Sequence, residues 1–213
     1  SWLKPVALAS GVFLFSLNKG KSKNIGRMLI GLGLILLALG WISQASIPMK
    51  TSDVLPVILG VLEKDAVLAI LVAAIMTWMA HSSLAIVLLL LSLAMSGVLP
   101  AELGLVMVLG VNLGATIAPL LATLRDAPAA VRIPAGNMIM RVIGVMVTLP
   151  FIDLLQPYIA QLSDEPARQI VNFHMAFNIC LLLVFLPLTG VVAKIVTQFF
   201  PDRIDPDDPS QPK

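Results

Sequence analysis

The sequence lacks the charge of a soluble protein. Charged residues make up only 12% of its 213 positions, whereas 58% are hydrophobic, and the mean hydropathy is +0.97. Soluble domains are about 25% charged and roughly 45–50% apolar. A soluble fold of this composition could not cover its surface with polar side chains, so we predict an integral membrane protein.

Other absences exclude further classes. Cys180 is the only cysteine, so the chain can form no internal disulfide and holds no Cys/His cluster with zinc spacing. The net charge of +2 is too small for a basic groove, and no nucleic-acid partner is expected. The chain begins with Ser1 and shows no charged segment followed by a small-residue cleavage site. We therefore expect a fragment whose signal peptide is absent or removed.

The N-terminal part pairs an apolar run with a basic segment. Residues 5–17 are apolar but shorter than the roughly 20 residues of a full span, which predicts a partial span. Four basic residues follow within nine positions, namely Lys19, Lys21, Lys23 and Arg27. By the positive-inside rule, this loop is expected in the cytoplasm, with a chance cluster as the alternative. We define residues 1–27 as the partial span and its loop.

Three later runs are long enough to cross a bilayer, namely residues 28–47, 133–154 and 169–199. A loop is expected at residues 125–132 and a hydrophilic connection at 156–168. Together these runs predict a transmembrane part over residues 28–200. Residues 201–213 are rich in Asp and Pro, which predicts a disordered tail or linker.

Two further segments are interrupted by polar residues. Residues 66–80 and 84–99 are half-length apolar runs that meet at His81-Ser-Ser83, which predicts a re-entrant hairpin. Gly110-Val-Asn-Leu-Gly-Ala-Thr116 interrupts the next run, and two glycines flanking an asparagine predict a broken helix.

The two predicted breaks are expected to form one site near the middle of the membrane. Non-helical backbone survives in hydrocarbon only where it lines a cavity walled by protein. Helix N-termini at such a point favour an anion, while unwound carbonyls and hydroxyls suit Na⁺. The alternative is ordinary helix packing, for which Ser, Thr and Gly are enriched in membranes.

Three short motifs occur in order along the chain. His81-Ser-Ser-Leu-Ala85 is similar to a Gln-Ser-Ser-Ser-Ala signature, and Gly110 to Thr116 is similar to Gly-Ala-Asn-Ile-Gly-Thr-Thr. Asn172-Phe-His-Met-Ala-Phe-Asn178 is similar to a downstream His-x-x-x-Asn pattern. Together they resemble the sodium-dependent phosphate cotransporters of the type II and bacterial branch, over most of residues 28–200. The resemblance implies an all-α, polytopic transmembrane helical bundle of two inverted repeats, of which this chain holds one.

The motifs and the resemblance together give candidate site residues. For phosphate these are Ser82, Ser83, Asn112, Gly114, Thr116 and Arg141. For the coupling cation they are His81, Ser82, Asn112 and Thr116, supported by His174 and Asn178. No cofactor is expected, and no metal beyond a transported Na⁺.

The sequence also departs from the family pattern. His81 replaces Gln and Leu84 replaces Ser, which removes oxygen ligands for Na⁺ and leaves coupling to H⁺ open. A neutral, hydrogen-bonded His81 is the alternative. Arg141 stands where a first His-x-x-x-Asn copy would have Asn. A charge inside a span is a functional candidate, although Arg141 could instead snorkel or pair with Asp126 or Asp153.

The predicted function is secondary active transport of inorganic phosphate, coupled to Na⁺ or H⁺, across a bacterial inner (plasma) membrane. The alternatives are a non-concentrative anion channel and a phosphate-sensing membrane protein, and sulfate or another oxyanion would use similar groups. An enzyme is not expected, because His81 and Ser82 are held apart as neighbours and His174 has no nucleophile partner. The expected partners are phosphate, Na⁺, the lipid bilayer, and a second repeat from the full-length chain or a partner subunit.

Overall fold

The computed structural model describes residues 2–17, 20–45 and 47–202, and within these ranges it is helical without a strand. The chain divides into two compact units, Ser1–Ser52 and Asp53–Lys213. Four helical segments of the described residues are long and apolar enough to cross a membrane, namely Gly20–Met49, Ala101–Thr123, Pro128–Leu162 and Pro166–Phe185. The predicted all-α polytopic bundle is confirmed. The predicted division at residues 27 and 200 stays a prediction, and residues 203–213 of the expected tail lie outside the described part.

The first unit is built from α1 (Leu3–Ser16), α2 (Gly20–Ala45) and the short α3 (Ile47–Lys50). Glycines bring α1 and α2 together, because a Cβ added at Gly11 would lie 2.7 Å from the backbone nitrogen of Ile30. The predicted basic loop is wrong in part: α2 begins at Gly20, so Lys21, Lys23 and Arg27 are helical. Lys and Arg are good helix formers, and Arg27 also stacks 5.9 Å from the centre of the Phe15 ring. The membrane side of this segment stays a prediction.

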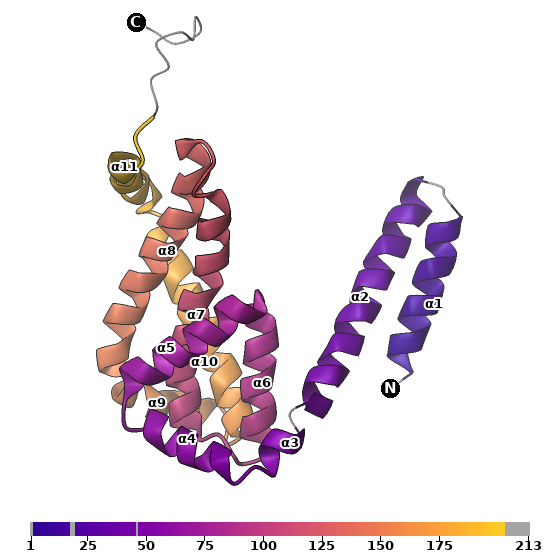
Figure 1. The fold of residues 1–213 in the computed structure, drawn as a ribbon, viewed down its shortest axis with the longest axis horizontal. Helices are drawn as coiled ribbons and strands as arrows, with labels where there is room; N and C mark the ends of the chain where they lie inside the picture. Colours follow the sequence, from indigo (N-terminus) through magenta and orange to yellow (C-terminus); the bar gives the residue numbers. More distant parts are fainter. Residues whose placement is uncertain (1, 18–19, 46, 203–213) are drawn as a thin grey trace, which may run out of the picture. The chain divides into compact units, whose positions relative to one another are not determined.

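The second unit begins with α4 (Val54–Leu62) and continues into two half-length helices, α5 (Ala66–Ala80) and α6 (Ser83–Met95). Asp65 caps α5 by accepting the backbone N–H of Leu68 at 3.0 Å. At 15 and 13 residues, α5 and α6 are only about 22 and 20 Å long. A bilayer core is roughly 30 Å thick, so neither helix crosses it alone. Figure 1 shows them as separate helices that meet at an angle.

The break between α5 and α6 lies where the sequence predicts it. His81 ends α5 in the left-handed conformation, with φ of 51°. Ser82 then starts α6 by accepting the backbone N–H of Ala85 on its hydroxyl at 3.2 Å. The C-terminus of α5 and the N-terminus of α6 therefore lie at the same tripeptide.

The predicted break at Gly110–Thr116 is wrong, because α7 (Ala101–Thr123) runs through it as one helix. Gly110 and Gly114 are one turn apart and face α5. A Cβ added at Gly110 would lie 2.9 Å from the Cβ of Ala73, and one at Gly114 would lie 2.7 Å from the Cβ of Thr77. These glycines serve the close approach of two helices, which is how small residues act in membrane bundles.

The helices after α7 also differ from the expected boundaries. The predicted loop at 125–132 is too long, since α8 (Pro128–Thr148) begins at Pro128, and proline suits the first position of a helix. A 3₁₀ turn, η1 (Leu149–Phe151), leads into α9 (Ile152–Leu162). The predicted hydrophilic connection at 156–168 is therefore helical over 156–162 and again from Pro166, where the next helix begins.

The last predicted span divides into α10 (Pro166–Phe185) and α11 (Thr189–Phe199). Pro187 lies between them and has no N–H to continue the helix. A buried cluster joins α8, α10 and α11 through Ala135, Phe185, Val192 and Val196. Figure 1 shows α11 lying across the end of α8.

α7 lies at the centre of the second unit and contacts α5, α6, α8, α9 and α10. Leu105, Val108, Leu109 and Val111 on this helix are fully buried. A polar side chain on α7 can therefore reach groups on several other helices. Asn112 does so.

Candidate functional site

A network of polar side chains connects α7, α8 and α10. Arg141 of α8 donates from Nη1 to Oδ1 of Asn112 and from Nε to Oδ1 of Asn137 at 3.4 Å. Nδ2 of Asn112 donates to the carbonyl of Val108 at 2.9 Å and lies 3.3 Å from Nδ1 of His174. We call Asn112, Asn137, Arg141, His174 and Asn178 the Arg141 cluster.

Asn112 is the buried centre of this cluster. Its exposed fraction is 1%, and both ends of its carboxamide are hydrogen-bonded. A buried amide without partners would cost several kcal/mol in an apolar interior. Because its partners lie on three helices, Asn112 fixes the position of the Arg141 guanidinium relative to α7 and α10.

Arg141 has no acidic partner among the described residues. The ion pairs found there join Arg132 to Asp202 at 2.7 Å and Arg168 to Glu165 at 3.9 Å. The alternative that Arg141 pairs with Asp126 or Asp153 is therefore wrong. A guanidinium has five N–H donors, of which the hydrogen bonds to Asn112 and Asn137 use two. Three donors remain for a ligand.

A cavity of about 260 Å³ is lined in part by Arg141. Its polar lining consists of Asn137, Arg141, Asn178 and Thr189, and the rest is apolar. Since a water molecule occupies about 30 Å³ of liquid, the cavity has room for a tetrahedral oxyanion with part of its hydration. The apolar part of the lining lowers the local dielectric constant, which would strengthen each electrostatic contact with such an ion.

The Arg141 cavity includes two residues that the sequence analysis did not select, Asn137 and Thr189. Asn137 precedes Arg141 by one helical turn and therefore lies on the same face of the helix. Its spacing from Arg141 could have identified it as a candidate site residue. Thr189 follows the helix break at Pro187, and nothing in the local sequence shows that it returns to α8.

A second cavity, of about 470 Å³, lies at the break between α5 and α6. His81, Ser82, Ser83 and Gly114 line it together with Thr77 and several apolar residues. The hydroxyl of Ser82 is used as the cap of α6, whereas that of Ser83 makes no hydrogen bond within the described residues. The N-terminus of α6 and the C-terminus of α5 both lie at this cavity. Such a site offers N–H donors to an anion and carbonyl oxygens to a cation.

The predicted site residues thus separate into two places. His81, Ser82, Ser83 and Gly114 line the cavity at the helix break, whereas Asn112, Arg141, His174 and Asn178 belong to the Arg141 cluster. Thr116 lines neither cavity and is buried to 1% exposure, with its hydroxyl donating to the carbonyl of Leu113 at 2.7 Å. The roles assigned to these residues stay predictions.

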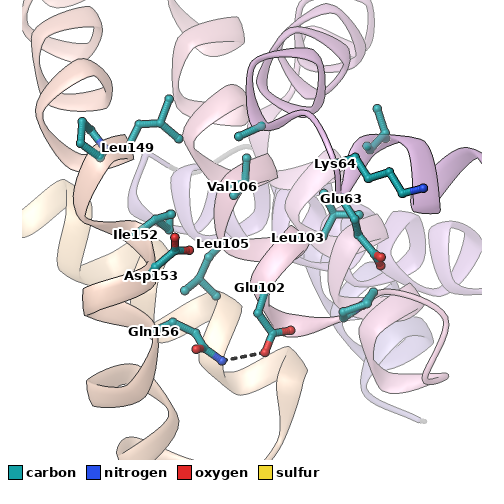
Figure 2. Close-up of a pocket in the computed structure, with 14 residues that line it drawn as sticks. Glu63, Lys64, Glu102, Leu103, Leu105, Val106, Leu149, Ile152, Asp153 and Gln156 are labelled. Carbon is teal, nitrogen blue, oxygen red and sulfur yellow. Dashed lines mark hydrogen bonds between the residues drawn. The ribbon is translucent and has the colours of Figure 1, made fainter.

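A third cavity, of about 660 Å³, lies near the start of α7 and is drawn in Figure 2. Its charged lining consists of Glu63, Lys64, Glu102 and Asp153. Gln156 reaches Glu102 from α9, donating from Nε2 to Oε1 at 2.6 Å. Three carboxylates against one ammonium repel an anion, so this cavity is no candidate for phosphate. These carboxylates do not form a metal site, since no three His, Cys, Asp or Glu side chains of the described residues are grouped so that they could hold a metal ion.

Comparisons with curated proteins give named relatives. The chain is 34% identical over 214 residues to "Putative inorganic phosphate export protein YjbB" of Escherichia coli (strain K12), a match that covers 100% of this chain and 39% of that protein. The protein of the same name from Salmonella typhimurium is 33% identical over the same length. "Uncharacterized protein YqeW" of Bacillus subtilis (strain 168) is 27% identical over 198 residues, 93% of this chain and 64% of that protein. The chain therefore spans about two fifths of the YjbB proteins.

No solved structure matches the chain. A family model described as Na+/Pi-cotransporter matches residues 45–182. This range contains α3 to α9 and most of α10, and with them the helix break and the Arg141 cluster. Apolar helices of spanning length within it agree with an integral membrane protein. The chain belongs to the Na+/Pi-cotransporter family, as its three motifs predict.

Proposed function

We propose that the chain is part of a carrier that moves inorganic phosphate across the membrane and binds it at the Arg141 cluster. The observation that carries this proposal is a half-buried arginine inside a helix of spanning length, with no acidic partner among the described residues. A cation at membrane depth is costly and is retained mainly where it has a function. An anion in the adjacent cavity would supply the missing negative charge.

Phosphate fits the Arg141 cluster chemically. The guanidinium fork matches two oxygens of a phosphate, which gives a bidentate contact. Asn137, Asn178 and Thr189 can add hydrogen bonds from the cavity wall. The family description and the name of the YjbB proteins support phosphate over other oxyanions.

We also propose a cation site at the helix break. The carbonyls at the end of α5 and the hydroxyls of Ser82 and Ser83 are hard oxygen ligands of the kind Na⁺ accepts. A second repeat, from the rest of a longer chain or a partner subunit, would complete the coordination that His81 and Leu84 do not provide. The family description supports Na⁺ as the coupling ion.

The direction of transport is proposed from the relatives. The YjbB proteins are named for export, which favours outward movement of phosphate across a bacterial inner membrane. A symporter driven by an inward Na⁺ gradient would instead favour uptake. Phosphate export and Na⁺-driven phosphate uptake therefore predict opposite responses of phosphate flux to an inward Na⁺ gradient.

Flux in proteoliposomes containing the intact protein tests the proposal. We expect phosphate flux that responds to an imposed Na⁺ gradient and falls at least tenfold in Arg141→Gln. Arg125→Gln is the matched control, since Arg125 is exposed in the connection between α7 and α8. Flux that responds to neither a Na⁺ gradient nor a pH gradient would indicate a channel, and phosphate binding without flux would indicate a sensor. Either result would contradict a carrier.

A further inference from the structure

We propose that His174 takes up a proton when phosphate binds beside Arg141, so that the protein holds a proton together with the anion. This inference rests on the proposed phosphate site. It concerns a different residue from His81, which is exposed at the other cavity. The evidence is the way Asn112 joins Arg141 to His174.

The orientation of the Asn112 carboxamide is set from the arginine side. Arg141 can only donate, so it holds the amide oxygen of Asn112. The amide nitrogen must then face His174, where it lies 3.3 Å from Nδ1. An amide nitrogen can also only donate, so Nδ1 accepts and carries no proton.

His174 is therefore a neutral imidazole in this arrangement. A proton added to Nδ1 would place two donors against each other, one from His174 and one from Asn112. The amide cannot turn over to relieve the clash, because its nitrogen would then face the guanidinium. Protonation of His174 and the present hydrogen-bond network exclude each other.

The titratable and charged residues on α10 and on the helices packed against it bear on how readily His174 takes up a proton. Of the helices packed against α10, α6 carries no titratable residue, α7 carries Glu102 in its first turn, and α9 carries Asp153 and Tyr158. On α8, Arg141 is the charge that shares Asn112 with His174. On α10 itself Arg168 lies in the first turn and is exposed.

A second positive charge beside Arg141 is unfavourable at membrane depth. A phosphate dianion in the adjacent cavity would compensate both cations. Bound phosphate then raises the affinity of His174 for a proton, and the bound proton raises the affinity of the protein for phosphate by the same factor, as linkage requires. The proton comes from solvent and forms one N–H bond at Nδ1, while Asn112 is released from His174.

Isothermal titration of the intact protein with inorganic phosphate tests this inference. Measurement at about pH 7 in two buffers of different ionisation enthalpy gives the number of protons taken up per phosphate bound. The variant His174→Gln stays neutral and keeps an oxygen that can accept from Asn112. We expect it to bind phosphate and to take up fewer protons than the unmodified protein, by up to about one per phosphate.

Arg125→Gln is the control and should take up as many protons as the unmodified protein, since Arg125 is exposed in the connection between α7 and α8. Phosphate's own titration contributes equally to all three proteins and cancels in the comparison. Equal proton uptake in His174→Gln and the unmodified protein would overturn the inference and leave phosphate transport standing. If the unmodified protein bound no phosphate, the proposed function would fall, and the inference with it.

A second measurement needs no variant. In protein labelled with ¹⁵N-histidine, phosphate should convert one imidazole from the neutral form to the form with both nitrogens protonated. The nitrogen chemical shifts distinguish these two forms. A histidine spectrum that shows no such conversion at saturating phosphate would overturn the inference even if His174→Gln does not fold.

Discussion

The guanidinium of Arg141 on α8 donates a hydrogen bond to the side-chain oxygen of Asn112 on α7. Asn112 is 1% exposed and cannot move away without rearranging the central helix. The bond therefore holds the charge of Arg141 beside its cavity before any ligand arrives. Preorganised donors of this kind bind an anion without the cost of ordering a flexible side chain.

The packing of α5 against α7 gives a stability prediction. Gly110→Val should destabilise the second unit by about 1–3 kcal/mol, because its side chain would overlap the Ile70 carbonyl and the Cβ of Ala73. Gly60→Ala is the control, since a Cβ added there meets nothing within 4 Å. Thermal unfolding in detergent measures both. If Gly110→Val melted at the temperature of the unmodified protein, the close approach of the two helices would be contradicted.

This packing also shows why sequence alone misplaced a break. Two glycines spaced by four residues in an apolar run fit an unwound helix and a tight helix contact equally well. The choice depends on whether another helix presents small residues opposite them, as α5 does with Ala73 and Thr77. That information is absent from the local sequence.

Other elements could be predicted because their signals are local. The lengths of the apolar runs identified the half-length helices, and the polar tripeptide at His81–Ser83 identified their junction. The Arg141 cluster could be predicted only as separate residues. Asn112, Arg141 and His174 lie on three helices, so their contact is a property of the packed bundle.

The neighbouring serines at the helix break should behave differently. Ser82→Ala removes the cap of α6 and should cost about 1 kcal/mol of stability. Ser83→Ala should leave the unfolding temperature unchanged, because its hydroxyl caps no helix, yet it should weaken phosphate binding and its response to Na⁺. Thermal unfolding and titration on the same two variants separate these effects. Equal loss of stability in both would assign Ser83 to packing.

The orientation of the first unit can be tested by labelling. Lys21, Lys23 and Arg27 lie near the start of α2, and positive residues beside a span are retained in the cytoplasm. A cysteine introduced at Ser22 should be protected from a membrane-impermeant reagent in intact cells and labelled after lysis. Cys180 is exposed and should first be replaced by Ala. Labelling of position 22 in intact cells would reverse the predicted orientation.

Asn112→Ala tests whether the buried amide positions the guanidinium. It removes the acceptor of Arg141 and the donor to His174, so phosphate should bind more weakly and the unfolding temperature should fall. Asn178→Ala is the comparison, because within the described ranges the Asn178 amide bonds only a backbone carbonyl of its own helix, at 2.8 Å. We expect the larger loss of affinity in Asn112→Ala. A larger loss in Asn178→Ala would contradict a guanidinium positioned by Asn112 as the main anion contact.

Phosphate affinity of the Arg141 variant tests the central claim most directly. A buried charge-assisted contact contributes about 1.5–3 kcal/mol, so Arg141→Gln should raise the dissociation constant at least about tenfold. Arg125→Gln should leave the dissociation constant unchanged, and both variants should remain folded. Isothermal titration of the three intact proteins with inorganic phosphate gives the answer. A dissociation constant in folded Arg141→Gln equal to that of the unmodified protein would contradict a phosphate site at the Arg141 cluster.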